Sequence, residues 1–197
     1  VSLLRPYPFE FWVDDVRALA DGISDVELEH WLEVDGLLDD SLIRGVSRGF
    51  VFELDVCFDV DNVLMLSEEE FLALGVARAY KRTFGLDVVF NRESFGRDVG
   101  LADVGRTVGW FTSQFPVPVV VGGGCDLVSL MGDVYGLKAA FGGVGHYGLN
   151  YGSLVYGLGL LEYKHCPVTF NFLSSEFSFR NDLFESLNDV LEFYDVG

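Results

Sequence analysis

The chain has 197 residues, of which 50% are hydrophobic, and its mean hydropathy is +0.30. This length supports one substantial core or one lobe of a two-lobed protein, and the composition excludes a disordered chain. The formal net charge of −18, from 31 acidic and 13 basic residues, argues against binding to nucleic acid or to an anionic membrane surface. No uninterrupted apolar run reaches the roughly 20 residues that a membrane-spanning helix requires.

Two helices are predicted near the start of the chain. Apolar residues recur at helical spacing over residues 9–19, and Ser24 followed by Glu27 has the spacing of a capping box for a second helix. That second helix is expected to bury Leu28, Trp31 and Leu32 and to stop at Gly36.

A strand, a helix and a second strand are predicted next. Residues 49–56 are rich in Phe and Val, which indicates a largely buried strand. Ser67 is expected to cap the N-terminus of a helix. The three glutamates that follow it would lie in the first turn, where the helix dipole favours negative charge. This helix is expected to end at Gly85. That helix is expected to bury Phe71, Leu72, Leu74, Val76 and Tyr80. Residues 86–91 predict a short apolar strand that places Glu93 at or just past its end.

The second half of the chain continues this alternation. It predicts a proline-led strand at 116–121, a glycine loop at 122–124, a helix from Asp126 to about Leu137, a strand at 168–173 and an amphipathic helix at 182–193. Residues 151–163 fit either a helix or a strand by periodicity. Strands and helices in this order predict an α/β or α+β layered fold.

Two glycine-rich stretches are interpreted as turns. Residues 143–148 satisfy GxGxxG, but a helix rather than a strand is expected before them. Residues 119–124 resemble a strand entering a phosphate loop, but no Gly-Lys-Ser/Thr follows.

The cysteines also predict no special chemistry. Cys57, Cys125 and Cys166 are isolated and lack CxxC spacing, so neither a disulfide framework nor a metal site is expected. The compartment expected for such a chain is a reducing cytoplasm. The N-terminus is not a signal peptide. Because the chain begins at Val1 without an initiating Met and ends soon after the FNFL strand, we expect an excerpt from a longer polypeptide.

Four segments in a fixed order carry a family resemblance. They read ESFGRD at 93–98, RTVGWFTSQFPV at 106–117, GLNYGSLVY at 148–156 and VTFNFL at 168–173. The chain thereby resembles the C-terminal half of a nonribosomal peptide synthetase epimerization domain, a member of the condensation-domain superfamily. The first, third and fourth segments correspond to that family's EGHGRE, GIGYGxLRY and FNYLG.

The resemblance implies a fold and a missing partner. Residues 1–197 would form a single partial domain, one lobe of the chloramphenicol-acetyltransferase-like architecture, with leading helices at 1–48 and the core lobe at 49–197. The N-terminal lobe, which carries the catalytic HHxxxDG histidines in the family, has no counterpart in this sequence. His30 to Gly36 approaches that motif with Trp31 in place of its second histidine, but the apolar spacing favours a helix end.

The resemblance also implies a site. Glu93 would be the catalytic carboxylate that shares proton transfer with a histidine of the absent lobe. Burial raises a carboxylate pKa toward the operating pH, and Val88, Val89, Phe90 and Phe95 are candidates to provide it. Arg97 could instead neutralise Glu93. The substrate-binding candidates are Arg97, Trp110, Thr112, Ser113, Tyr151, Asn171 and Phe172.

The implied activity is inversion of the α-carbon of an aminoacyl or peptidyl thioester. The substrate would arrive on the phosphopantetheine arm of a peptidyl carrier protein, and no directly bound cofactor is expected. Phe95 and Phe172 replace a His and a Tyr of the family motifs, each removing a hydrogen-bonding group. With the histidine lobe also absent, the chain alone is expected to be inactive.

Two alternatives remain open at this point. One is a lobe of a condensation domain, which forms peptide bonds, and the other is a non-catalytic remnant of the same fold. For carrier docking, the densest basic group in this acidic chain consists of Lys81, Arg82, Arg92 and Arg97.

Overall fold

A computed structural model describes residues 8–38, 65–97 and 103–172. The long elements in chain order are α1 (Phe9–Asp21), α2 (Asp25–Gly36), α4 (Glu68–Phe84), β1 (Val88–Phe95), β2 (Thr112–Val119), α5 (Leu127–Gly142) and β3 (Val168–Phe170). Between α5 and β3 lie a 3₁₀ turn at Gly145–Gly148, the short helix α6 (Leu149–Gly152) and a π-helical turn at Ser153–Gly157. Helices combined with a mixed sheet confirm the α/β class in its general form. The strand expected at 49–56 and the helix expected at 182–193 lie outside the described residues.

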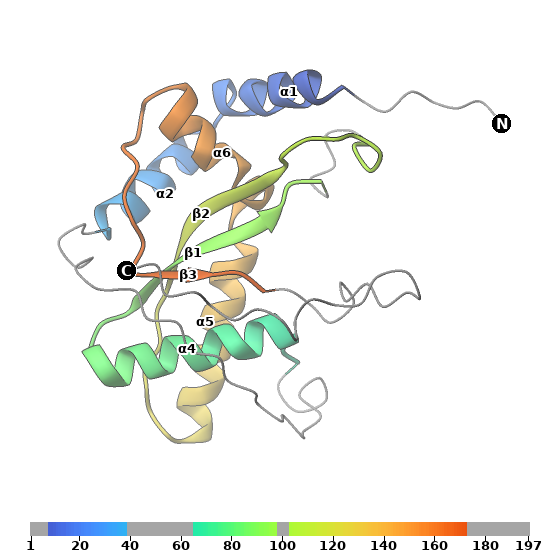
Figure 1. Ribbon diagram of the computed structural model, residues 1–197. Coiled ribbons are helices and arrows are strands. Elements are labelled where there is room, and N and C mark those ends of the chain that lie inside the picture. The colour runs from blue at the N-terminus through green and yellow to red at the C-terminus, as the bar shows by residue number, and fades with distance from the viewer. Residues whose placement is uncertain (1–7, 39–64, 98–102, 173–197) are drawn as a thin grey trace, which may run out of the picture.

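In the part of the chain that the structure describes, the sheet consists of three strands in the order β2-β1-β3 (Figure 1). The central strand β1 pairs antiparallel with β2 and parallel with β3. β1 extends to Phe95, four residues beyond its predicted end at Asn91, so Glu93 lies within the strand and opposite Gln114 of β2. β2 likewise begins at Thr112 rather than at Pro116.

Two prolines lie within β2, opposite Asn91 and Val89 of β1. Proline has no N–H to donate to a sheet ladder, so it is tolerated in a strand that has a neighbour on only one side. Among the described residues β2 is such an edge strand, and this position explains Pro116 and Pro118.

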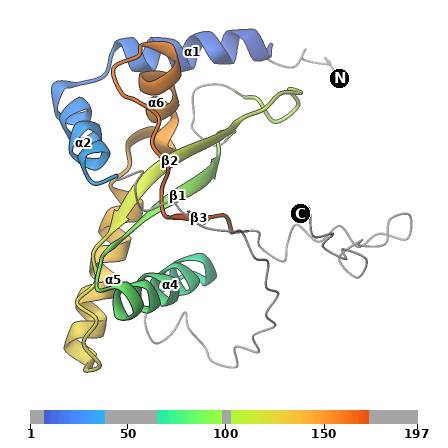
Figure 2. The ribbon, with the colours of Figure 1, turned by 60° about the vertical axis from the view of Figure 1, so that its left-hand side comes forward.

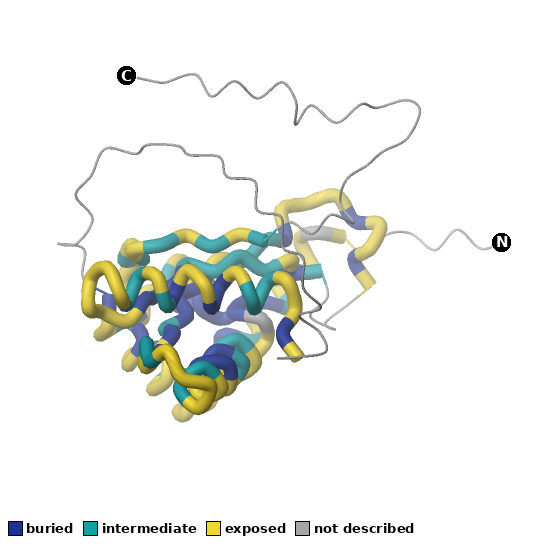
Figure 3. The backbone as a smooth tube through the Cα atoms, turned by 90° about the horizontal axis from the view of Figure 1, so that it is seen from below, coloured by how far each residue is buried: buried dark blue, intermediate teal, exposed yellow. Residues whose placement is uncertain are grey.

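The main core lies between the sheet and the helices α4 and α5. Val88 and Phe90 of β1 and Phe115, Val117 and Val119 of β2 are all buried in it. Figure 2 shows α4 and α5 together below the sheet, with α1, α2 and α6 grouped beyond β2. Seen from below in Figure 3, the buried parts of the chain face inward between these layers.

The helix α4 begins and ends as predicted, but it buries a different face. Ser67 and Glu70 form a capping box, and Gly85 ends the helix in the left-handed conformation at φ 73°. The buried residues are Ala73, Leu74 and Ala77, whereas Leu72 and Val76 are exposed. Two alanines bring the helix backbone close to its neighbours, and the larger Phe71 and Tyr80 pack at the margin.

The helix α2 also has its predicted capping box, formed by Ser24 and Glu27. Trp31 and Val34 are its buried residues, whereas Leu32 is exposed, contrary to the expectation from helical spacing. The Trp31 ring contacts the rings of Phe115 and Tyr151 at centroid distances of 6.5 and 5.2 Å. The helix interpretation of residues 30–36 is therefore confirmed.

A second, smaller cluster joins α1 to α6 and to the chain before β2. It contains Trp12 and Val16 of α1, Val104, Phe111 and Leu149. The short helix α6 thus connects both clusters, because Leu149 belongs to the second and Tyr151 to the first. Regular helical structure ends at Gly157, so of the range 151–163 only the first part is helical.

Both glycine-rich stretches are turns, as predicted. The GxGxxG stretch directly follows α5 and contains a 3₁₀ turn, so the strand that a dinucleotide fingerprint needs is missing before it. After β2, the Gly122 N–H donates to Asp133 Oδ1 at 2.6 Å, and Arg78 bonds both Asp133 and the Gly124 carbonyl. Asp126 then caps α5 by accepting from the Ser129 N–H.

Across the described residues, no helix has both the length and the apolar character needed to cross a bilayer.

Candidate functional site

A cavity of about 380 Å³ opens between one face of the sheet and the helices beyond β2. Its floor is formed by Asn91 of β1 with Thr112, Gln114 and Pro116 of β2. Residues two apart in a strand share a face, so these side chains mark the face opposite to the main core. The other walls come from α1, α6 and the segment that follows α6.

Part of the segment between α6 and β3 forms one wall. Tyr163, Lys164 and Cys166 line the cavity, although none of them belongs to a helix or strand. The segment is anchored by Lys164, whose Nζ donates to Asp35 Oδ2 at 2.8 Å and to the Asp35 carbonyl at 3.0 Å. An ion pair to α2 therefore fixes this wall.

Glu93 lies on the cavity face of the sheet, but its side chain does not line the cavity. It follows Asn91 by two residues in β1, so both side chains point to the same face. Gln114, which does line the cavity, donates its Nε2 hydrogen to Glu93 Oε1 at 2.6 Å. The carboxylate is half-buried at the margin of the site, and the amide of Gln114 connects it to the cavity.

The expected apolar surroundings of Glu93 are not formed. Val88 and Phe90 belong to the main core on the opposite face of β1. Phe95 shares the face of Glu93 but is exposed, and Val89 lies at the far end of the strand. The alternation of side chains along β1 is the reason, because Glu93 lies inside the strand and not past its end as predicted.

Arg97 does not pair with Glu93. Its Nη1 donates to the carbonyls of Val104 and Thr107 at 2.7 and 2.9 Å, and its guanidinium lies 4.1 Å from the ring centroid of Phe111. These contacts tie the chain after β1 to the chain before β2. Arg97 therefore positions the connection that leads into the cavity wall, and it is not among the residues that line the cavity.

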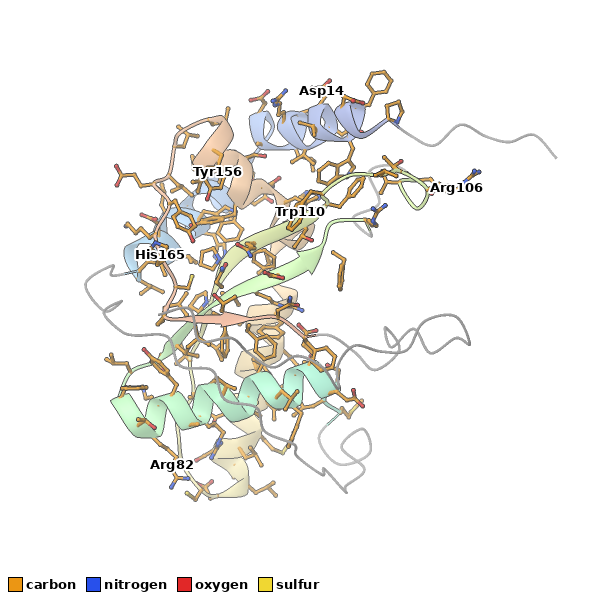
Figure 4. All side chains as sticks on the ribbon, in the orientation of Figure 1. Asp14, Arg82, Arg106, Trp110, Tyr156 and His165 are labelled. Atoms are coloured by element: carbon orange, nitrogen blue, oxygen red, sulfur yellow. The ribbon has the colours of Figure 1, made fainter. Side chains whose placement is uncertain are left out.

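Trp110, Thr112 and Ser113, which belong to the GWFTS segment together with Phe111, all line the cavity. Phe111 is buried in the second cluster, while Trp110 is 80% exposed. In Figure 4, Trp110 lies beside β2 and Tyr156 beside α6. The structure thus brings three of the predicted binding residues to one cavity wall.

Tyr151 is buried in the wall of the same cavity. Burial raises the pKa of its phenol above the ordinary value, and the thiolate that Cys166 forms at high pH and the Asp35 carboxylate act in the same direction. Burial also raises the pKa of the Cys166 thiol to about 12. Both groups are therefore neutral at pH 7 and can take part in hydrogen bonds there.

Asn171 and Phe172 follow β3 and do not line the cavity. Phe170 of β3 pairs with Arg92 of β1, and the two strands are parallel. Asn171, the next residue after Phe170, therefore lies beside Glu93 of the central strand. Asn171 is exposed and Phe172 is half-buried. Of the eight predicted site residues, four line the cavity, and Glu93 lies at its margin.

Several lining residues are not found by the sequence motifs. Gln114 lies inside the motif segment at 106–117, but it is not among the predicted binding residues. Tyr163, Lys164 and Cys166 reach the site through a segment without regular structure, for which periodicity gives no signal. Within the described residues, no group of His, Cys, Asp and Glu side chains could hold a metal ion.

The predicted basic group is largely engaged within the chain. Lys81 pairs with Asp87 at 3.0 Å, and Arg92 pairs with Glu69 at 2.8 Å while lying over the ring of Phe141. Arg82 is exposed at the end of α4 (Figure 4). Together with the contacts of Arg97, these pairs show that the four residues do not form one basic surface.

Comparison with known proteins places a similar segment in a biosynthetic multienzyme. The chain is 30% identical over 153 residues to a phenolphthiocerol/phthiocerol polyketide synthase subunit of Mycobacterium tuberculosis, and the same holds for the Mycobacterium bovis protein. The match covers 74% of this chain but only 10% of those proteins, so the chain spans about a tenth of the length of the curated relatives. No family model matches the chain.

Proposed function

We propose that this chain is one lobe of a nonribosomal peptide synthetase epimerization domain with the chloramphenicol-acetyltransferase-like architecture. The observation that carries the proposal is the position of Glu93. Its half-buried carboxylate lies on the cavity face of the central strand and is hydrogen-bonded by Gln114, a cavity-lining residue. The four motif segments and the similarity to a polyketide synthase subunit support a place in a multidomain synthase.

The proposed reaction inverts the α-carbon of a carrier-bound thioester. The thioester carbonyl acidifies the α-proton, and removal of this proton gives an enolate. One group must remove the proton and another must return a proton to the opposite face. Glu93 is one of these two groups, and a histidine of a partner lobe is the other. Gln114 holds the Glu93 carboxylate in place through the bond between its Nε2 and Oε1.

The cavity offers a place for the arm that delivers the substrate. Asn91, Thr112 and Gln114 present uncharged donors and acceptors along its floor. A phosphopantetheine arm has amide groups that need such partners when they leave water. Its thioester would reach Glu93 at the cavity margin, where a histidine-bearing lobe would close the site from the other side.

The second candidate is a condensation lobe, which forms an amide bond without exchange of the α-proton. The observation that favours it is the similarity to a subunit named as a polyketide synthase rather than an epimerase. In that case Glu93 would act only as a structural partner of Gln114.

One assay separates the two candidates. The polypeptide that holds this chain together with its histidine lobe is incubated in D₂O with phenylalanyl- and N-acetylphenylalanyl-pantetheine thioesters. Epimerization predicts incorporation of deuterium at the α-carbon and a mixture of stereoisomers. Condensation predicts no exchange, but formation of an amide when an amine acceptor is added. Absence of exchange above the rate without protein would contradict our proposal.

A further inference from the structure

One wall of the cavity is formed by a stretch of chain without regular structure. Residues 158–166, here called the strap, connect the π-helical turn after α6 to the short strand β3 (Figure 1, orange). Tyr163, Lys164 and Cys166 of the strap line the cavity, and its other walls belong to the sheet, α1 and α6. A wall of this kind can move without unwinding a helix or separating two paired strands.

The two halves of the strap are attached in different ways. In the first half, the N–H groups of Leu160 and Leu161 donate to the Leu154 carbonyl at 2.9 and 3.3 Å, and the Leu161 side chain is buried in the main core. In the second half, Lys164 Nζ donates to Asp35 Oδ2 at 2.8 Å and to the Asp35 carbonyl at 3.0 Å. The first half is thus part of the core, whereas an ion pair with α2 holds the second half.

This ion pair has a cost in the closed state. The side chains of Lys164 and Asp35 are 27% and 18% exposed, so both charges have lost much of their hydration. Oδ1 of Asp35 is buried, and no donor among the described residues bonds to it. When the pair separates, water hydrates both charges and supplies the partners that Asp35 Oδ1 lacks. The closed wall is therefore only moderately favoured over an open one.

Other contacts of the second half lie near the surface. The Tyr163 ring stacks on the Tyr156 ring with their centroids 6.2 Å apart, and the two residues are 45% and 75% exposed. Tyr163 also contacts His165, which is exposed. Because much of this half already meets solvent, its movement exposes little additional apolar surface, and the hydrophobic cost of opening is small.

We propose that residues 162–166 open and close one wall of the cavity, with the ion pair between Lys164 and Asp35 as the contact that keeps the wall closed. Opening removes Tyr163, Lys164 and Cys166 from the lining, so a ligand can enter and leave while the sheet, α1 and α6 stay in place. The movement is a property of the fold and does not depend on which reaction the cavity serves.

The half-buried thiol of Cys166 reports on this movement, because it becomes accessible when the wall opens. Iodoacetamide at pH 8 is added to the full 197-residue chain, and the alkylation rate of Cys166 is divided by that of the exposed Cys125. Lys164→Met removes the ammonium and leaves the Asp35 carboxylate unpaired, so this ratio should rise about fivefold or more. Lys164→Arg keeps the charge and should leave the ratio nearly unchanged.

Lys138→Met is the matched control. Lys138 pairs with Glu70 at 3.0 Å, and this pair is also partly buried, but Lys138 lies on α5 and does not line the cavity. Its loss should leave the ratio unchanged. No rise of the ratio in Lys164→Met would overturn the proposal, and so would an equal rise in both methionine variants, which would indicate general destabilisation.

A measurement on the unchanged chain separates local opening from unfolding and applies even if a variant does not fold. At urea concentrations below the unfolding transition, alkylation of Cys166 through a local opening should vary little with urea, whereas alkylation through global unfolding rises steeply. A rise as steep as that of global unfolding would overturn the proposal. The result is independent of deuterium exchange at the α-carbon, so the moving wall and the proposed reaction can fail separately.

Discussion

The change Gly148→Ala should destabilise the fold strongly for two reasons, one in the backbone conformation and one in the packing. Gly148 has φ 73°, a left-handed conformation that costs an L-residue about 1–2 kcal/mol. A Cβ at this position would also lie 2.0 Å from Cδ1 of Phe115, a ring that is 1% exposed. Overpacking of a core costs about 1–3 kcal/mol, and the stiffer unfolded chain offsets about 0.5–1 kcal/mol. The expected net loss is about 1–4.5 kcal/mol.

Gly152 provides the matched control for this prediction. It lies in the same GLNYG segment with φ −59°, and apart from its chain neighbours and its own helix backbone no atom of the described residues lies within 4 Å of an added Cβ. Because alanine is the better helix former, Gly152→Ala should stabilise the protein by about 0.5–1 kcal/mol. Urea unfolding followed by tryptophan fluorescence gives both free energies. Similar effects of the two substitutions would refute the assignment of the left-handed turn to Gly148.

Three further changes test other parts of the structure. Ser67→Ala should lower the free energy of unfolding by about 1 kcal/mol, measured in urea, because the capping box of α4 loses its hydroxyl acceptor; an unchanged value would mean that the cap contributes nothing. Asp133→Asn should cost about 2–4 kcal/mol in the same assay, because it leaves the charge of Arg78 without its buried partner, and a loss below about 0.5 kcal/mol would contradict this. Iodoacetamide at pH 8 should alkylate the exposed Cys125 at least about tenfold faster than the half-buried Cys166, whose pKa of about 12 leaves almost no thiolate. Mass spectrometry of the tryptic peptides gives the two rates, and equal rates would show that the pKa of Cys166 is not raised.

Local signals predicted the ends of the helices well. Ser24 and Ser67 each precede a glutamate three residues later, and both form the expected capping boxes. Gly85 adopts the left-handed conformation that ends α4. These features depend on hydrogen bonds within one turn of the helix, so the sequence contains all of the information that decides them.

Features that depend on distant partners were predicted less well. The buried face of α4 runs through Ala73 and Ala77, because close packing against neighbouring elements prefers small side chains there over Leu72 and Val76. Strand β1 continues to Phe95 because β2 supplies hydrogen-bond partners along its whole length. A helical or apolar pattern in one segment does not reveal which other segment it will meet.

The site shows the same division between local and distant information. The motif segments located Trp110, Thr112, Ser113 and Tyr151, which line one cavity. They did not reveal the wall anchored by Lys164, whose partner Asp35 lies 129 residues away in the sequence. An ion pair between residues so far apart leaves no pattern in the nearby sequence from which it could be predicted.

The most direct test of the account is the role of Glu93 in α-proton exchange. Glu93→Gln keeps the size and hydrogen-bonding capacity of the side chain but removes its ability to carry a proton. Glu162→Gln, at an exposed position outside the cavity lining, is the control. Deuterium incorporation into N-acetylphenylalanyl-pantetheine thioester by the larger polypeptide should fall at least about hundredfold in Glu93→Gln and remain unchanged in Glu162→Gln. Undiminished incorporation in the Glu93 variant would show that another group moves the proton.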